Sequence, residues 1–382
     1  MPHHNTVFGD VLKLVPWHRF EALVEKHDAD ARVRRLSTKG QFLALLYGQF
    51  SGASSLREIV MGLSSHAARL YHLGADPVRR STFSDANAQR PVAVFTELLE
   101  TMMKQAHRRL RRKLAETTYL IDATSVRLNE LSADWARFSA GVCGVKVHVI
   151  YDADADRPIY AAVSAAKVND IAAAQQMPIE PGATYVFDLG YYDYAWWARL
   201  DAVGSRIVTR FKSNTPIKVM EELSITPGSN ILSDRIGFLP ARQASSRNNP
   251  MRNAVREVRI TTDTGKVLRI LSNDLDASAQ EIADLYRRRW AIELFFRWVK
   301  QTLKITRFVG TSENAVRIQI AVALIAFLLL RLAQAMQKAI PSPILFARLV
   351  RTNLMHCRAI DRLLHPPPQI VHDQRQINLA LY

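Results

Sequence analysis

The chain contains 382 residues, 48% of them hydrophobic and 23% charged, which excludes a disordered or fibrous protein and allows two or three structural units. Its 51 lysines and arginines against 35 aspartates and glutamates give a formal net charge of +16, which indicates a polyanionic partner such as nucleic acid, or else a basic enzyme with a solvated surface. The two cysteines, Cys143 and Cys357, indicate neither a disulfide framework nor a structural zinc site, and the N-terminus lacks the features of a secretory signal.

The first 115 residues carry the three- and four-residue spacing of apolar side chains that predicts helices. The predicted helices fall at 16–27, 38–50, 54–63 and 90–116, and the last of them is long and amphipathic. Its basic end, RRLRRK at 108–113, is either a solvated helix tail or a patch that contacts phosphates. We therefore expect an all-helical N-terminal domain.

From residue 117 the pattern changes to the alternation that is typical of strands. Three such runs are followed by helix and strand in turn, which predicts an α/β fold with a mixed sheet and helices on its faces. Short alternating runs among Gly, Pro, Asn and Ser predict a β-rich insertion at 212–265. Helix returns at Ser278, where SAQE has the form of a capping box, and continues to about residue 305. The apolar run 320–330 has 11 residues, too few for a bilayer, and predicts a buried core helix.

Two aspartates lie in apolar strand sequences: Asp122 follows TTYLI and Asp188 follows TYVF. Burying an unpaired carboxylate is costly, so these two groups need a neutralising partner. Strand ends of an open α/β sheet converge on one cleft, and two aspartates on neighbouring strands there would offer hard oxygen ligands to Mg²⁺ or Mn²⁺. The simpler alternative for each aspartate is a turn or helix cap.

The stretch YRRRWAIELFFRWVK, which begins at Tyr286, places one glutamate among many cations. At 100° per residue, Tyr286, Arg289, Glu293 and Lys300 lie within about 60° of one another beside the buried face of a helix. Glu293 is therefore a candidate third carboxylate, and three carboxylates can hold the two cations that in-line displacement at a phosphodiester requires. The simpler alternative is an ion pair of Glu293 with Arg289 or Arg297.

Tyr286, Arg289, Glu293 and Lys300 match, without a gap, the Y-(2)-R-(3)-E-(6)-K signature of the insertion-sequence-four family of DDE transposases. The segments LIDATSV, VFDLGYYD and RRSTFSDANAQRP extend the likeness, so the sequence resembles that family along nearly its whole length. The resemblance implies an RNase H-like catalytic core with a β-rich insertion between the second aspartate and the glutamate. Taken with the chain's own patterns, it divides the sequence into a helical N-terminal DNA-binding domain (1–115), the core (116–211 and 266–310), the insertion (212–265) and a helical C-terminal region (311–382).

The resemblance also implies a function. The protein would be the transposase of a bacterial insertion sequence, located in the cytoplasm with the nucleoid, and would cut and paste its element at terminal inverted repeats. Its partners would be double-stranded DNA at those repeats and at the target, and a second copy of the chain in the DNA complex. Asp122, Asp188 and Glu293 would be catalytic and would hold two Mg²⁺ or Mn²⁺ ions. Contacts to the DNA backbone would come from Tyr286, Arg289, Lys300, Arg297 and Lys304.

Two features depart from the family pattern. Relatives form a DNA hairpin with an aromatic residue of the insertion stacked on a flipped base, but the insertion here has no Trp, which leaves Phe211 or Phe238. No arginine directly follows Asp188, so Arg199 or Arg210 would have to substitute. A DNA-binding relic that no longer cuts, and a different RNase H-like nuclease, remain alternatives.

Some residues keep two interpretations. The segments 54–63 and 81–90 form either a helix-turn-helix pair or part of a plain helical bundle. Lys146 and His148 could face the cleft, although a hydrogen-bonded structural role is the stronger prediction for His148. Aromatic residues of the signature helix, Trp290 and Trp298 among them, are predicted to pack, with DNA stacking as the alternative for Trp298.

Overall fold

The computed structural model describes residues 6–31, 33–108, 117–303, 308–337, 339–357, 359–360 and 363–364. Within these residues the centre of the molecule is a ten-stranded mixed sheet in the order β2-β3-β1-β5-β6-β12-β11-β8-β7, with β4 paired to β3. Its strands are β1 (Thr118–Leu128), β2 (Arg137–Ser139), β3 (Val142–Asp152), β4 (Arg157–Ala165), β5 (Thr184–Phe187), β6 (Arg206–Arg210), β7 (Lys218–Glu222), β8 (Ile231–Phe238), β11 (Val255–Thr261) and β12 (Val267–Ser272). A separate small hairpin joins β9 (Arg242–Ala244) to β10 (Arg247–Asn248).

The first half of the sheet has an RNase H-like arrangement, as predicted. Strands β4, β3 and β1 are antiparallel neighbours, and β5 and β6 then run parallel to β1. The parallel strands need crossover connections, which the helices α9 (Asp170–Ala174) and α10 (Tyr194–Ala202) supply. The carboxyl end of β5, at Phe187, therefore lies beside Ile121 in the middle of β1.

The β-rich insertion continues this sheet instead of forming a unit of its own. Strand β12 pairs antiparallel with β6, so that Leu271 lies opposite Thr209, and β11, β8 and β7 follow outward. The predicted insertion ended at residue 265, but the strand that connects it to the core begins at Val267. Backbone pairing, which the composition of the stretch does not reveal, makes core and insertion one layer.

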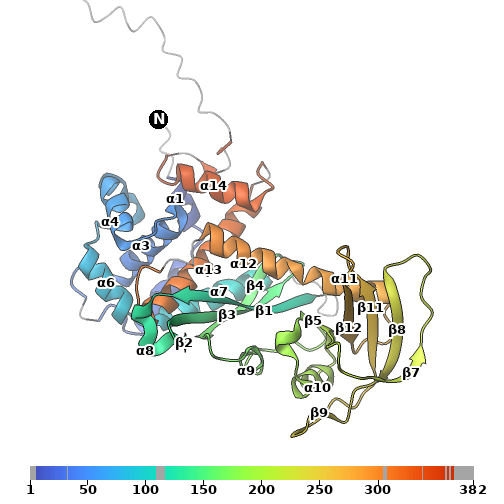
Figure 1. Cartoon of the computed structure of the whole chain (residues 1–382). Helices are drawn as coiled ribbons and strands as arrows, with labels where there is room; N and C mark the ends of the chain where they lie inside the picture. Colours follow the sequence, from blue (N-terminus) through green and yellow to red (C-terminus); the bar gives the residue numbers. More distant parts are fainter. Residues whose placement is uncertain are drawn as a thin grey trace, which may run out of the picture.

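Helices cover both faces of the sheet (Figure 1). One face packs against α7 (Val92–Arg108), α12 (Trp290–Thr302) and α13 (Glu313–Ala335), and the other face packs against α9 and α10. Side chains alternate along β1, so Leu120 and Val126 belong to the first of these cores and Tyr119 and Ile121 to the second. Asp122 shares the parity of Leu120 and faces α12.

The N- and C-terminal helices share one core around α13. The N-terminal helices are α1 (Val7–Leu12), α2 (Trp17–Lys26), α3 (Thr38–Ser51), α4 (Leu56–Ser65), α5 (Ala67–Leu70), α6 (Arg80–Gln89) and α7, with a short 3₁₀ helix η1 (Tyr71–Leu73). Helix α13 packs against α3, α6 and α7 and against the C-terminal α14 (Pro343–Asn353). By length and composition α13 could cross a membrane, but 83% of its apolar window is buried inside the protein. The predicted core helix is thus confirmed.

The two segments proposed as a helix-turn-helix pair are α4 and α6. They contact each other, but α5, η1 and the loop that follows separate them along the chain. A helix-turn-helix needs a turn of about three or four residues, so the structure agrees with the helical bundle. The basic segment 108–113 lies outside the described residues except for Arg108, the last residue of α7.

A buried ion pair holds the insertion to the start of the signature helix. Asp234 on β8 accepts hydrogen bonds of 2.8 and 2.6 Å from the guanidinium of Arg256 on β11, and both side chains are at most 6% exposed. The same guanidinium donates to the carbonyl of Leu275 at 3.0 Å. This network raises the pKa of Arg256, mainly through the bond to Asp234.

Asp234→Ala is expected to lower the free energy of unfolding by about 3–5 kcal/mol, because it leaves the Arg256 charge buried without its partner. Urea unfolding measures this change. The matched control is Glu222→Ala, which removes the exposed ion pair with Arg235 and should change stability by about 0.5 kcal/mol or less. Equal effects of the two variants would contradict this view of the network.

Candidate active site

Strand register brings Asp122 and Asp188 together. Ile121 on β1 lies beside Phe187 on β5, so the next residue of each strand is one of the two aspartates. Asp188 has just left its strand and caps the short 3₁₀ helix η4 (Leu189–Tyr191), where its Oδ1 accepts a 2.8 Å hydrogen bond from the Gly190 amide. The capping interpretation and the cleft interpretation of Asp188 therefore both apply.

Glu293 reaches the same edge from α12, which packs on β1. The predicted single helix is in fact two, α11 (Ala279–Arg288) and α12, which meet at Arg289. Two backbone hydrogen bonds between residues three apart form the junction. The Arg289 amide donates to the Tyr286 carbonyl at 3.1 Å, and the Ile292 amide donates to the Arg289 carbonyl at 3.2 Å. The predicted cap at Ser278 is confirmed, because its hydroxyl accepts from the Glu281 amide at 3.1 Å.

Arg289 lies among the carboxylates. Its guanidinium is 2.5 Å from Glu293 Oε1 and 3.8 Å from Asp122 Oδ2, and its side chain is only 17% exposed. The ring of Tyr286 lies under the same guanidinium, with 5.8 Å between the guanidinium carbon and the ring centroid. The ion pair that was the simpler interpretation of Glu293 is therefore present, and it is part of the carboxylate cluster.

Asp122 is strained electrostatically. Burial raises the pKa of its carboxyl to about 6, and the negative charges of Asp188 and Glu293 add to this effect. The Ala123 amide, 2.8 Å from Asp122 Oδ1, and the Arg289 charge lower the pKa but do not compensate. Above about pH 6 the charged form of Asp122 is therefore held at a cost in free energy.

A cleft of about 430 Å³ opens beside two of these carboxylates, Asp122 and Glu293, and Asp188 does not line it. Its lining includes Asp122, Glu293, Arg297 and Lys300. Burial lowers the pKa of Lys300, as expected for an ammonium that is partly withdrawn from water. The structure thus brings the three carboxylates, Arg289, Arg297 and Lys300 to one region, whereas Lys304 lies outside the described residues.

The donor set suits a hydrated divalent cation. Among the described residues no three Asp, Glu, His or Cys side chains converge closely enough to enclose a bare metal ion. Mg²⁺, however, keeps several waters and is held by one or two carboxylates and substrate phosphates. A bound cation would offset both the burial of the charged Asp122 carboxylate and the negative charges of Asp188 and Glu293, which together raise its pKa.

The structure distinguishes among the weaker candidates. Burial raises the pKa of Tyr286, and the charge of Arg210 at the end of β6 opposes this rise. Arg199 instead donates to the Gln175 carbonyl. Phe211 is buried under the guanidinium of Arg269, 4.5 Å from its ring centroid, and is closed to a base. Phe238 lines a hollow formed within the insertion and the segment before β7.

Trp290 was predicted to pack, and this prediction is wrong. Its side chain is 50% exposed at the start of α12. It lines a hollow of about 280 Å³ together with Tyr286, Arg289 and insertion residues such as Ile260. At 100° per residue Trp290 lies about 120° from the buried Phe296, so it faces away from the core. Trp298 does pack, edge-on to Phe327 with ring centroids 4.9 Å apart.

Lys146 and His148 belong to the other face of the sheet. They pair with Ser125 and Ala123 of β1, whose side chains point away from Asp122. His148 is fully buried, and its Nε2 lies 2.8 Å from the Ser164 hydroxyl, which agrees with the structural interpretation.

Residues 113–329 match the family model described as a transposase DDE domain, and residues 3–76 match a domain of unknown function, DUF4372. The chain is 39% identical over 286 residues to the putative transposase y4zB of Sinorhizobium fredii, which covers 75% of this chain and 80% of that protein. The chain belongs to the DDE transposase family. The predicted family is confirmed, and with it DNA cleavage and strand transfer, DNA binding and a dependence on divalent metal.

Two further relatives of the transposase carry names of insertion-sequence enzymes. The probable transposase for insertion sequence element IS5377 of Geobacillus stearothermophilus is 29% identical over 304 residues, 75% of this chain and 79% of that protein. The putative transposase for insertion sequence element IS4SA of Synechocystis is 26% identical over 268 residues, 68% and 73% of the two chains.

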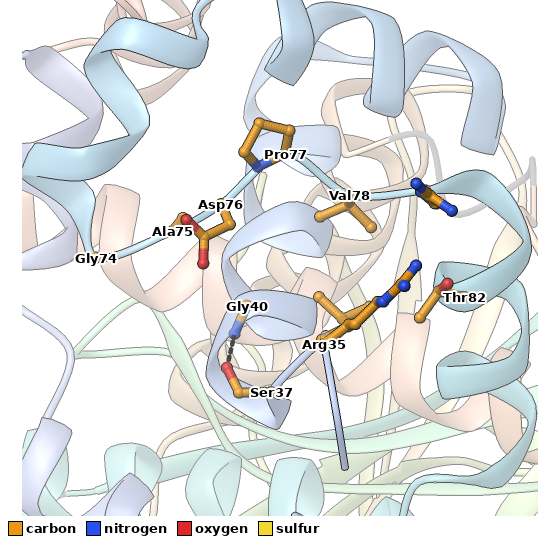
Figure 2. A pocket seen from close by; sticks show the side chains of 11 residues that line it. Arg35, Ser37, Gly40, Gly74, Ala75, Asp76, Pro77, Val78 and Thr82 are labelled. Atoms are coloured by element: carbon orange, nitrogen blue, oxygen red, sulfur yellow. Dashed lines mark hydrogen bonds between the residues drawn. The ribbon is translucent and has the colours of Figure 1, made fainter.

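The helical N-terminal part of the transposase has a polar hollow of about 260 Å³ (Figure 2). It lies where α3 begins, and Arg35, Arg79 and Thr82 line it together with the loop at 74–78. The Ser37 hydroxyl caps α3 here by accepting from the Gly40 amide at 3.0 Å. Neither arginine forms an ion pair within the described part of the chain.

Asp122→Asn is expected to stabilise the metal-free transposase at pH 8 by roughly 1–3 kcal/mol. The folded-state pKa of about 6 exceeds the unfolded value, so the charged carboxylate costs stability above pH 6, and this cost disappears as the pH falls toward 4. Urea unfolding in EDTA at pH 8 and pH 4.5 measures the difference. The exposed Asp85→Asn is the control, and a loss of stability in Asp122→Asn at pH 8 would show that Arg289 dominates instead.

Proposed function

We propose that Asp122, Asp188 and Glu293 are the catalytic residues of this transposase and hold two divalent cations, Mg²⁺ or Mn²⁺. The observation that carries the proposal is the register of β1 and β5, which sets two aspartates side by side opposite the glutamate of α12. Bound there, two cations activate the attacking oxygen and stabilise the leaving oxygen of a phosphodiester. The strands fix the aspartates, so the protein holds these ligands without reorganisation.

Arg289 changes partners in this proposal. In the metal-free protein its guanidinium neutralises Glu293 and Asp122. Its Nε is buried without a hydrogen-bond partner among the described residues, so the group has a donor to spare. The planar guanidinium can form two parallel hydrogen bonds with either a carboxylate or a phosphate. Once cations neutralise the carboxylates, the Arg289 guanidinium binds a DNA phosphate instead. Tyr286, Lys300 and Arg297 contact neighbouring phosphates, with Lys304 following along the chain.

The DNA substrate in this proposal is the end of an insertion sequence. The transposase excises the element at its terminal inverted repeats by cut and paste and joins it to target DNA as a homodimer that holds both ends, in the bacterial cytoplasm with the nucleoid. The N-terminal helices contact the repeats, with Arg35 and Arg79 at the polar hollow as phosphate ligands. Trp290 takes the base-stacking role in a hairpin intermediate, because it is exposed beside Tyr286 and Arg289 whereas Phe211 is closed.

Glu293→Gln is expected to keep DNA binding and to lose metal-dependent strand cleavage by a factor of about 10² or more, since it removes one charged ligand and keeps the shape. The assay uses duplex DNA that carries the gene's own flanking sequence, with Mg²⁺, Mn²⁺ or EDTA. Asp284→Asn, an exposed carboxylate on α11, is the control. Cleavage by Glu293→Gln at the wild-type rate would overturn the proposal, as would cleavage by the wild type in EDTA.

Lys300→Ala is expected to weaken DNA binding and to reduce the slope of log K against log salt by about 0.9, the loss of one phosphate contact. Fluorescence anisotropy across a salt series gives the slope for catalytically inactive protein. Lys218→Ala on β7, an exposed lysine on the edge strand of the sheet, should leave the slope unchanged. Parallel shifts of the two variants would contradict a specific contact.

A further inference from the structure

A fourth carboxylate lies beside the proposed catalytic group. Asp170 is the first residue of α9, after the Asn169 cap, and α9 packs against η4. Its Oδ1 is held by the Lys146 ammonium at 2.9 Å, and His148 Nδ1 lies 3.9 Å from the same oxygen. Lys146 also donates to the Val168 carbonyl at 3.1 Å, so this arrangement fixes the carboxylate in one orientation.

The other oxygen of Asp170 faces Asp188 across Gly190. A Cβ atom at Gly190 would lie 3.0 Å from Asp188 Oδ1 and 3.2 Å from Asp170 Oδ2. The two oxygens are therefore at most 6.2 Å apart, the sum of those distances. A glycine here leaves a space between two carboxylates that any larger side chain would fill. A cation with about 2.1 Å to one oxygen and a bound water toward the other spans such a gap.

The Tyr191 hydroxyl provides an independent observation. The side chain is 1% exposed, and its hydroxyl has no hydrogen-bond partner among the described residues. Burial raises the pKa of Tyr191 well above its usual value, and the charges of Asp122, Asp170 and Asp188 raise it further. Tyr191 lies on η4, the turn that Asp188 caps, and its hydroxyl donates to none of these carboxylates. A buried hydroxyl in this position needs a ligand that the protein itself does not provide.

We propose that Asp170, Asp188 and Tyr191 form a subsite that binds the water shell of one of the two divalent cations. The inference rests on the proposed function of Asp122, Asp188 and Glu293 and adds residues from the opposite face of the sheet. The missing side chain of Gly190 leaves space for the water shell, and Lys146 orients Asp170. The Tyr191 hydroxyl forms a hydrogen bond with a metal-bound water. Asp170 is thus a positioning residue that acts on the cation through water.

A purely structural role makes different predictions. If Asp170 serves only to pair with Lys146, then Asp170→Asn and Lys146→Met should destabilise the fold alike and leave metal binding unchanged. If Asp170 also faces a cation, Asp170→Asn should weaken metal binding, because it removes a negative charge beside the cation. Metal affinity, measured beside stability, then separates the two roles of Asp170.

The test is a Mn²⁺ titration of the full-length protein bound to duplex DNA. The electron paramagnetic resonance signal of free Mn²⁺ measures how much of the metal is bound at each step. We expect Tyr191→Phe and Gly190→Ala each to lower the affinity for one of the bound Mn²⁺ ions by about 3- to 10-fold. Tyr191→Phe should unfold at the same urea concentration as wild type or higher, because the lost hydroxyl had no partner in the protein. The control is Tyr185→Phe, a buried tyrosine whose hydroxyl accepts from the Glu180 amide at 2.7 Å and which should leave Mn²⁺ affinity unchanged.

Unchanged Mn²⁺ binding in Tyr191→Phe, Gly190→Ala and Asp170→Asn would overturn the inference. Glu293→Gln in the same titration separates this result from a failure of the proposed function. If Glu293→Gln loses a Mn²⁺ equivalent while the three subsite variants do not, the catalytic carboxylates stand and the subsite does not exist. If Glu293→Gln also binds Mn²⁺ like wild type, both proposals fail.

Discussion

The burial of the Asp122 carboxylate beside Asp188 and Glu293 is the constraint around which this site is organised. The pairing of β1 with β5 forces Asp122 and Asp188 together, and α12 adds Glu293 from above. No backbone adjustment separates the aspartates without breaking the sheet, so the protein must supply positive charge to this point. Arg289 supplies it from the junction of α11 and α12.

The same constraint connects distant parts of the chain to the site. The insertion strands extend the core sheet through β12, and one face of them packs near α11 and Trp290. The long apolar α13 packs against the N-terminal helices and against α12. The helix that bears Glu293 therefore contacts the central hydrophobic core. The proposed metal site is therefore supported by elements from several parts of the chain.

Much of this was predictable from the sequence. Strand alternation and the positions of Asp122 and Asp188 predict the sheet and its cleft edge, and the four signature residues predict the third carboxylate. The break at Arg289 and the place of Asp170 were not predictable. The break depends on two backbone hydrogen bonds between residues three apart, and the place of Asp170 depends on the approach of α9 to Gly190. Local periodicity contains none of these.

The most direct measurement is the anomalous scattering of Mn²⁺ in crystals of the protein bound to an element end. The account predicts Mn²⁺ peaks about 2.1–2.2 Å from oxygens of Asp122, Asp188 and Glu293, with the Arg289 guanidinium moved from Glu293 to a DNA phosphate. Peaks away from these carboxylates, or an Arg289 that still bridges Asp122 and Glu293 with metal and DNA bound, would contradict it.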